Sequence, residues 1–85
     1  MEWEKAGRAR MMLRFPRHRK QIADANFLAI SDLLEAYGRT AIARDELRKQ
    51  EVSDPARLKE YETLCQKLER DLLRMLAAAI PRTSR

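Results

Sequence analysis

The segment LKEYETLCQKLERDLLRMLAAAI, residues 58–80, contains neither glycine nor proline and consists mainly of good helix formers. Asp54 and Pro55 stand just before it. An aspartate is a favoured N-cap, and a proline is favoured at the first helical position, where no backbone N–H is needed. Pro81 follows the segment and predicts that the helix stops at or before it. The sequence therefore predicts a long helix whose two ends are both marked.

The apolar residues of this helix form an unusually wide face. At about 100° per residue they cover roughly half of its circumference, which is more than one partner helix would bury. We therefore expect further copies of the protein, or another protein, to cover the surplus. The residues of this face are Leu58, Tyr61, Leu64, Cys65, Leu68, Leu72, Leu73, Met75, Leu76, Ala79 and Ile80.

A second long helix is predicted over residues 21–49. Its start is open, because the helix could begin directly after Pro16 or at Asp24 acting as a cap. Gly38 in its middle costs about 1 kcal/mol relative to alanine, and we interpret it as a point of close backbone approach to a neighbour. The apolar residues at helical spacing are Ala23, Phe27, Ile30, Leu33, Leu34, Tyr37 and Ala41.

The connection between these helices, residues 51–54, is short, and short links join antiparallel neighbours. The predicted fold is therefore all-α: an antiparallel two-helix hairpin over residues 21–80. Two helices cannot enclose a core, so we expect the hairpins to assemble into a higher oligomer, a ring. The residues assigned to the core or the oligomer contact are Phe27, Ile30, Leu34, Tyr37, Leu58, Tyr61, Leu68, Leu72 and Leu76.

Composition excludes several ways of stabilising so small a protein. The 85 residues form one domain at most. Cys65 is the only cysteine and His18 the only histidine, which excludes a disulfide and disfavours a zinc site. The start MEWEKAGRAR lacks the apolar region of a signal peptide, and no apolar run reaches the length of a membrane span. We expect a cytoplasmic protein of a bacterial host cell, with no metal, no cofactor and no membrane partner.

The charge is concentrated at the N-terminus. Residues 1–20 carry seven basic and two acidic side chains, whereas residues 21–85 carry eleven of each, so the whole net charge of +5 lies in the first segment. This basic N-terminal arm is either a solvated leader or a phosphate-binding segment, since clustered cations release counterions from nucleic acid. The second interpretation predicts weak binding to double-stranded DNA, nearly independent of sequence, through Arg8, Arg10, Arg14, Arg17, Arg19 and Lys20.

No residue pattern indicates catalysis. His18 lies in a basic run without an acidic or thiol neighbour, and Cys65 lies in the apolar face, as a structural thiol would. The chain has no glycine-rich phosphate loop. A helical enzyme of the chorismate-mutase type is the best enzymatic alternative, but no arrangement of basic residues in the sequence favours it. We expect the protein not to be an enzyme.

The C-terminal half resembles the phage terminase small subunits. In that family an Asn-Pro or Asp-Pro opens a last long helix, which ends in a short segment with proline, then serine or threonine, then arginine. The matching residues here are Asp54-Pro55 and the tail Pro81-Arg82-Thr83-Ser84-Arg85. The preceding helix is also similar, with Phe27-Leu28, Asp32-Leu33-Leu34-Glu35-Ala36-Tyr37, Ala41 and Leu47. The resemblance covers residues from about 21 to 85.

This resemblance implies a role in DNA packaging. Small terminase subunits assemble into rings through a helical hairpin, recognise viral DNA and regulate the large terminase subunit, an ATPase and nuclease. Their C-terminal segment engages the large subunit, which maps here onto Pro81, Arg82, Thr83, Ser84 and Arg85. The chain departs from the family in its first 20 residues, which are too few for the usual helix-turn-helix domain. This departure suggests a gene-transfer-agent type with little sequence specificity.

An alternative from another class remains open. A small helical regulator or chaperone, dimeric or tetrameric, would also hide the apolar faces and would bind a partner protein. In that case the basic arm would be an incidental leader. The number of subunits distinguishes this alternative from a ring.

Overall fold

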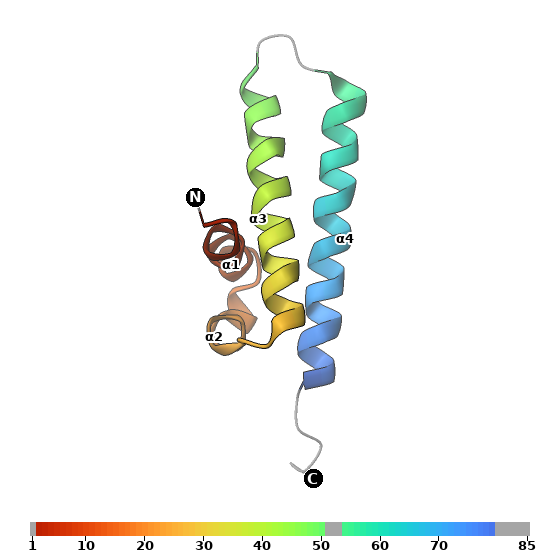
Figure 1. Cartoon of the computed structure of the whole chain (residues 1–85). Coiled ribbons are helices and arrows are strands. Elements are labelled where there is room, and N and C mark those ends of the chain that lie inside the picture. Colours follow the sequence, from red (N-terminus) through yellow and green to blue (C-terminus); the bar gives the residue numbers. More distant parts are fainter. Residues whose placement is uncertain (1, 51–53, 80–85) are drawn as a thin grey trace.

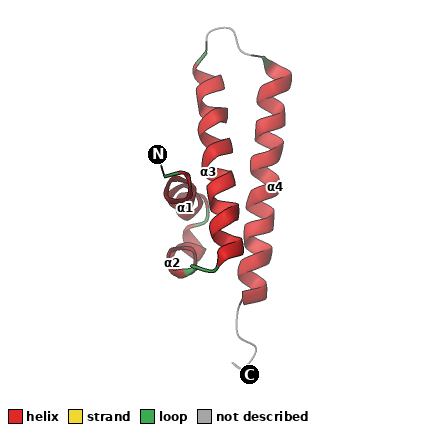
Figure 2. Cartoon of the chain, viewed as in Figure 1, coloured by secondary structure: helices red, strands yellow, loops and turns green. Residues whose placement is uncertain are grey.

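The computed structural model describes residues 2–50 and 54–79 of the chain. Within them it contains the helices α1 (Trp3–Arg14), α2 (Arg19–Asp24), α3 (Leu28–Lys49) and α4 (Pro55–Ala79), a 3-10 turn η1 (Pro16–His18), and no strand (Figure 2). The predicted all-α class is confirmed.

Helix α4 begins as the sequence predicts. The Asp54 carboxylate accepts hydrogen bonds from the backbone N–H groups of Ala56, at 3.1 Å, and Arg57, at 3.3 Å. These are two of the N–H groups that a helix start leaves without partners. Pro55 occupies the first helical position. The helix is described as far as Ala79, and the predicted end at Ile80 lies outside the described residues.

Helices α3 and α4 lie side by side and run in opposite directions (Figure 1). Residues 51–53, which link them, lie outside the described part of the chain. Among the residues predicted for the core or the oligomer contact, Ile30, Leu34, Tyr37, Leu72 and Leu76 are buried inside this single chain. Leu58, Tyr61 and Leu68 are half-buried.

The start of the second long helix differs from the prediction of residue 21. Helix α2 ends at Asp24, which therefore does not cap a following helix, and α3 begins only at Leu28. Ala25 and Phe27 have extended backbones between the two helices, and Phe27 is 41% exposed rather than in the core. The break is stabilised from a distant part of the sequence, because Arg8 Nη1 donates to the carbonyl oxygens of Ile22 and Ala25, each at 2.6 Å.

Most of the predicted basic arm is helical and packs on the rest of the chain. Residues Trp3–Arg14 form α1, which crosses α3 (Figure 1). At the crossing a Cβ atom on Gly7 would lie 2.9 Å from the Gly38 nitrogen, and one on Gly38 would lie 2.8 Å from the Gly7 nitrogen. Real Cβ contacts are not that short, so only glycine permits this approach. The close approach predicted for Gly38 is confirmed, with α1 of the same chain as the neighbour.

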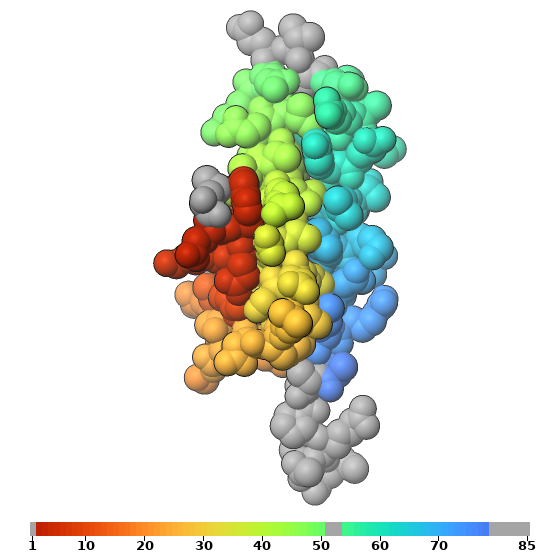
Figure 3. All heavy atoms as spheres, viewed as in Figure 1, coloured from red at the N-terminus to blue at the C-terminus, as the bar shows by residue number. Residues whose placement is uncertain are grey.

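The N-terminal helices bury apolar side chains of α3 inside the single chain. Helix α3 lies between α1 and α4 (Figure 3). The core joins Met11 of α1 and Ile22 of α2 to the buried residues of α3 and to Cys65, Leu72 and Leu76 of α4. On α4, by contrast, Leu58, Tyr61 and Leu68 are only half-buried and Leu64 is 41% exposed. Assembly into a ring remains a prediction that this single chain does not test.

Candidate functional site

The six predicted DNA-binding residues separate into two groups. Arg8 and Arg10 act inside the molecule. Besides its bonds to two carbonyls, Arg8 pairs with Glu4, and Arg10 Nη1 lies 2.8 Å from Asp45 Oδ2 on α3. Their donors hold α1 against α2 and α3. Arg8 is therefore less available to an external ligand than the sequence suggested, whereas Arg10 also lines the cleft described below.

The other four cations lie at the C-terminal end of α1, in η1 and at the start of α2. We call this group the basic turn. They are Arg14, Arg17, Arg19 and Lys20, and all four are exposed. Lys20 pairs with Asp24 at 3.3 Å, whereas Arg17 and Arg19 form no ion pair within residues 2–50 and 54–79. The guanidinium carbon of Arg14 lies 5.6 Å from the centre of the Phe15 ring, a cation–π distance. The basic turn therefore presents most of the accessible charge of the first 20 residues.

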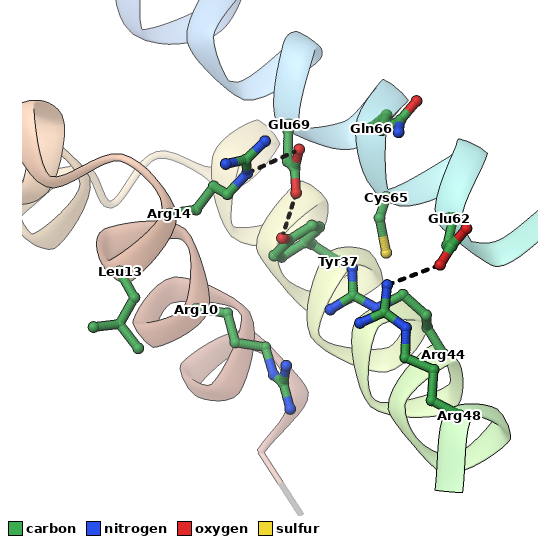
Figure 4. Close-up of a pocket in the computed structure, with 10 residues that line it drawn as sticks. All are labelled: Arg10, Leu13, Arg14, Tyr37, Arg44, Arg48, Glu62, Cys65, Gln66 and Glu69. Carbon is green, nitrogen blue, oxygen red and sulfur yellow. Dashed lines mark hydrogen bonds and ion pairs between the residues drawn. The ribbon is translucent and has the colours of Figure 1, made fainter. Parts of the chain in front are cut away.

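A second concentration of arginines lines a cleft between α1, α3 and α4 (Figure 4). This arginine cleft has a volume of about 580 Å³. Arg10 and Arg14 come from α1, and Arg44 and Arg48 come from α3. The other lining residues are Leu13, Tyr37, Glu62, Cys65, Gln66 and Glu69. Neither Arg44 nor Arg48 is among the site residues predicted from the sequence, so the sequence alone did not reveal this cleft.

The floor of the arginine cleft is a hydrogen-bonded triad. The Tyr37 hydroxyl donates to Glu69 Oε2 at 2.7 Å, and Arg14 Nε lies 3.5 Å from Glu69 Oε1 (Figure 4). Burial, and then the bond to Glu69, raises the pKa of Tyr37 far above its ordinary value. The hydroxyl is therefore a fixed donor, and the nearly buried carboxylate of Glu69 has partners on both α1 and α3.

Ion pairs also hold the wall of the cleft formed by α3. The Asp45 carboxylate forms ion pairs with Arg10 of α1 and with Arg44, whose Nε lies 3.2 Å from Oδ1. Burial alone would raise the pKa of Asp45, but the two guanidinium groups outweigh it and lower that pKa below its ordinary value. Arg48 Nη2 lies 2.8 Å from Glu62 Oε2 on α4. Ion pairs around the cleft therefore link α1 to α3 and α3 to α4, in addition to the packing of these helices.

Cys65 and His18, the two residues considered for catalysis, are both packed against neighbouring side chains. Burial raises the pKa of the Cys65 thiol, with Arg44 opposing it in part, so the thiol is protonated and unreactive at neutral pH. The Nδ1 atom of His18 is buried without a hydrogen-bond partner in the described part of the chain, and the ring packs edge-on against Phe15 at 6.4 Å. No cluster of three metal-ligating side chains occurs within residues 2–50 and 54–79.

Three remaining points concern membrane spans, the C-terminal tail and similarity to known proteins. Among the helices of the described residues, none combines the length and apolar character needed to cross a membrane. The predicted partner-binding tail, Pro81–Arg85, lies outside the described residues. The chain matches no protein-family model, no curated protein and no solved structure.

Proposed function

We propose that the protein is a small-terminase-like adaptor of a DNA-packaging motor, which binds double-stranded DNA with little sequence specificity and recruits or regulates a large ATPase/nuclease subunit. The observation that carries this proposal is the basic turn. It gathers Arg14, Arg17, Arg19 and Lys20 at one exposed corner of the molecule, next to an aromatic ring. The resemblance of residues 21–85 to terminase small subunits supplies the biological context.

The arrangement of the cations in the basic turn favours contact with phosphates over recognition of bases. Its cations lie at the C-terminal end of α1, on a 3-10 turn and on a helix of six residues, and not along one long helix that could enter the major groove. Phosphate contacts fix position but carry no direct sequence information. Four such contacts predict that the logarithm of the binding constant falls with the logarithm of salt concentration with a slope of about −3.6.

The DNA-binding part of the proposal is tested by matched charge removal. The triple variant R17Q/R19Q/K20Q removes three charges from the basic turn, and the control R57Q/K59Q/R70Q removes three exposed charges from α4. We expect the first variant to lose most of its DNA affinity in fluorescence anisotropy at low salt, and the control to keep most of it. Equal losses in both variants would show that only the net charge matters. A strong preference for one duplex sequence would contradict the non-specific, gene-transfer-agent type.

The partner-binding part of the proposal concerns residues 81–85. Removal of Pro81–Arg85 should leave the number of helical residues and the number of subunits unchanged but abolish binding to the large subunit. Undiminished binding of the truncated protein would refute the assignment of the tail. A homo-oligomeric ring belongs to the same proposal and predicts a native mass of several subunits in light scattering.

A second candidate function is a small helical regulator that binds a partner protein. The observation that favours it is the enclosed core of the single chain, in which Met11 and Ile22 cover α3 and reduce the need for many copies. Light scattering at low and high salt separates the two candidates. A stable dimer or tetramer that stays unchanged when DNA or the large subunit is added would favour the regulator.

A further inference from the structure

We propose that the arginine cleft between α1, α3 and α4 is a binding site for a multiply charged phosphate group, carried either by a small molecule or by a nucleic-acid backbone. Its cations are Arg10, Arg14, Arg44 and Arg48. The site is distinct from the exposed basic turn, although Arg14 borders both. It does not depend on the packaging function proposed above.

The charges in the cleft favour an anion. Four guanidinium groups face two carboxylates, Glu62 and Glu69, among the lining residues. Asp45, which is not a lining residue, pairs with Arg10 and Arg44, so the complete set still has an excess of one positive charge. The negative charge of Glu69 is further offset by the hydrogen bond from the Tyr37 hydroxyl. The net charge of the set therefore favours an incoming phosphate despite the three carboxylates.

The arginines keep unused donors for such a ligand. A guanidinium group carries five N–H donors in a planar fork that matches phosphate oxygens. Arg14 and Arg44 each use Nε for the carboxylate contacts described above, and Arg10 uses Nη1. The side chain of Arg44 is only 17% exposed, so its remaining donors have little bulk solvent around them. A half-buried cation with spare donors, such as Arg44, gains more from a bound oxyanion than a fully exposed one.

The size of the cleft fits a small ligand. Its volume of about 580 Å³ lies within the range of small-molecule sites, which is roughly 300–1,000 Å³. Three different helices supply its cations and their partners, so the arginines are held in place before a ligand arrives. Leu13, exposed at its rim, gives the ligand one apolar neighbour.

The test is a titration of the isotopically labelled protein with pyrophosphate and, separately, with a short DNA duplex, followed through the NMR signals of the arginine Nε–H groups. We expect the signals of Arg10, Arg14 and Arg44 to move together and to saturate. Saturation by pyrophosphate identifies a free phosphate ligand, and saturation by DNA alone identifies the backbone as the source. If neither titration saturates the cleft signals by about 10 mM, the proposal is wrong.

Variants separate the cleft from the rest of the surface. Arg44→Gln should weaken binding about tenfold or more, because a charge-assisted hydrogen bond is removed. Arg48→Gln, whose side chain is 51% exposed, should weaken it without loss of folding. Arg70→Gln on the exposed face of α4 is the matched control. Unchanged affinity in folded Arg44→Gln and Arg48→Gln proteins would overturn the proposal.

The same experiment distinguishes this inference from the proposed function. The variant R17Q/R19Q/K20Q leaves the four cleft arginines intact, so it should still bind pyrophosphate. If the wild-type protein bound pyrophosphate but no DNA in any assay, the packaging adaptor would be refuted and the phosphate site would stand. If the protein bound DNA but the cleft signals responded to neither DNA nor pyrophosphate, the phosphate site would be refuted and the packaging adaptor would stand.

Discussion

Gly7 of α1 and Gly38 of α3 meet backbone to backbone, where a Cβ atom on Gly7 would lie 1.9 Å from the Leu34 carbonyl oxygen and one on Gly38 2.1 Å from that of Trp3. The two glycines therefore set how closely α1 approaches α3. The close approach brings Trp3 within cation–π range of Arg39, at 5.9 Å, and Arg10 within reach of Asp45. One crossing point thus determines whether residues 3–14 form an arm or part of the core.

Gly38→Ala should destabilise the protein. The substitution gains about 1 kcal/mol of helix propensity, but its methyl group would overlap the α1 backbone, and such overpacking typically costs about 1–3 kcal/mol or more. We expect a net loss of stability and a partial release of α1, measured by urea unfolding and by hydrogen exchange of α1. Ala36→Ser, at an exposed position of the same helix, is the control and should change little. A Gly38→Ala protein more stable than wild type would contradict the crossing.

Tyr37→Phe should destabilise the protein by about 1–3 kcal/mol, because it deprives the nearly buried Glu69 carboxylate of its hydrogen bond. Glu69→Leu, which removes the acceptor, should show a comparable loss, and the two changes combined should cost less than their sum, since both break the same contact. Urea unfolding of the four proteins gives the coupling. Tyr61→Phe, at a half-buried tyrosine of α4, provides the comparison. Strict additivity would mean that the bond contributes nothing.

The stability supplied by Asp45 should depend on pH. Its pKa in the folded protein lies below the ordinary value of 3.8, so its contribution is complete above the unfolded-state pKa and is lost as the pH falls through the folded-state pKa. The difference in unfolding free energy between wild type and Asp45→Asn should therefore shrink as the pH falls from about 5 to about 2. Arg10→Gln should remove part of the same dependence. A difference that stays constant over this range would contradict the ion pairs.

Arg8→Gln should affect folding more than DNA binding. The variant leaves the carbonyls of Ile22 and Ala25 without their charged donor, at a cost of about 1–3 kcal/mol. We expect faster hydrogen exchange in α2 but a DNA affinity closer to wild type than that of Arg17→Gln. If Arg8→Gln reduced DNA affinity as strongly as Arg17→Gln while remaining folded, the division of the cations into internal and exposed groups would be wrong.

Local chemistry made parts of the fold predictable. The start of α4 depends on Asp54 and Pro55, which act on backbone groups two or three residues away. The helical class follows from spacing and propensity over residues 58–80, and the glycine in the middle of α3 indicated a close neighbour. In each case the deciding contact lies within a few residues, or the residue type admits few explanations.

The break between α2 and α3 and the arginine cleft depend on contacts between distant residues. Arg8 supplies donors to carbonyls 14 and 17 residues further along the chain, and Arg14 reaches Glu69 across 55 residues. Periodicity alone cannot tell an arginine facing water from one facing a cleft, because both lie on the polar side of a helix. Sequence by itself established the helical class, the start of α4 and the location of the charge. The packing of the helices determined which cations pair within the molecule and which line the cleft or face solvent, because that division depends on how α1 crosses α3.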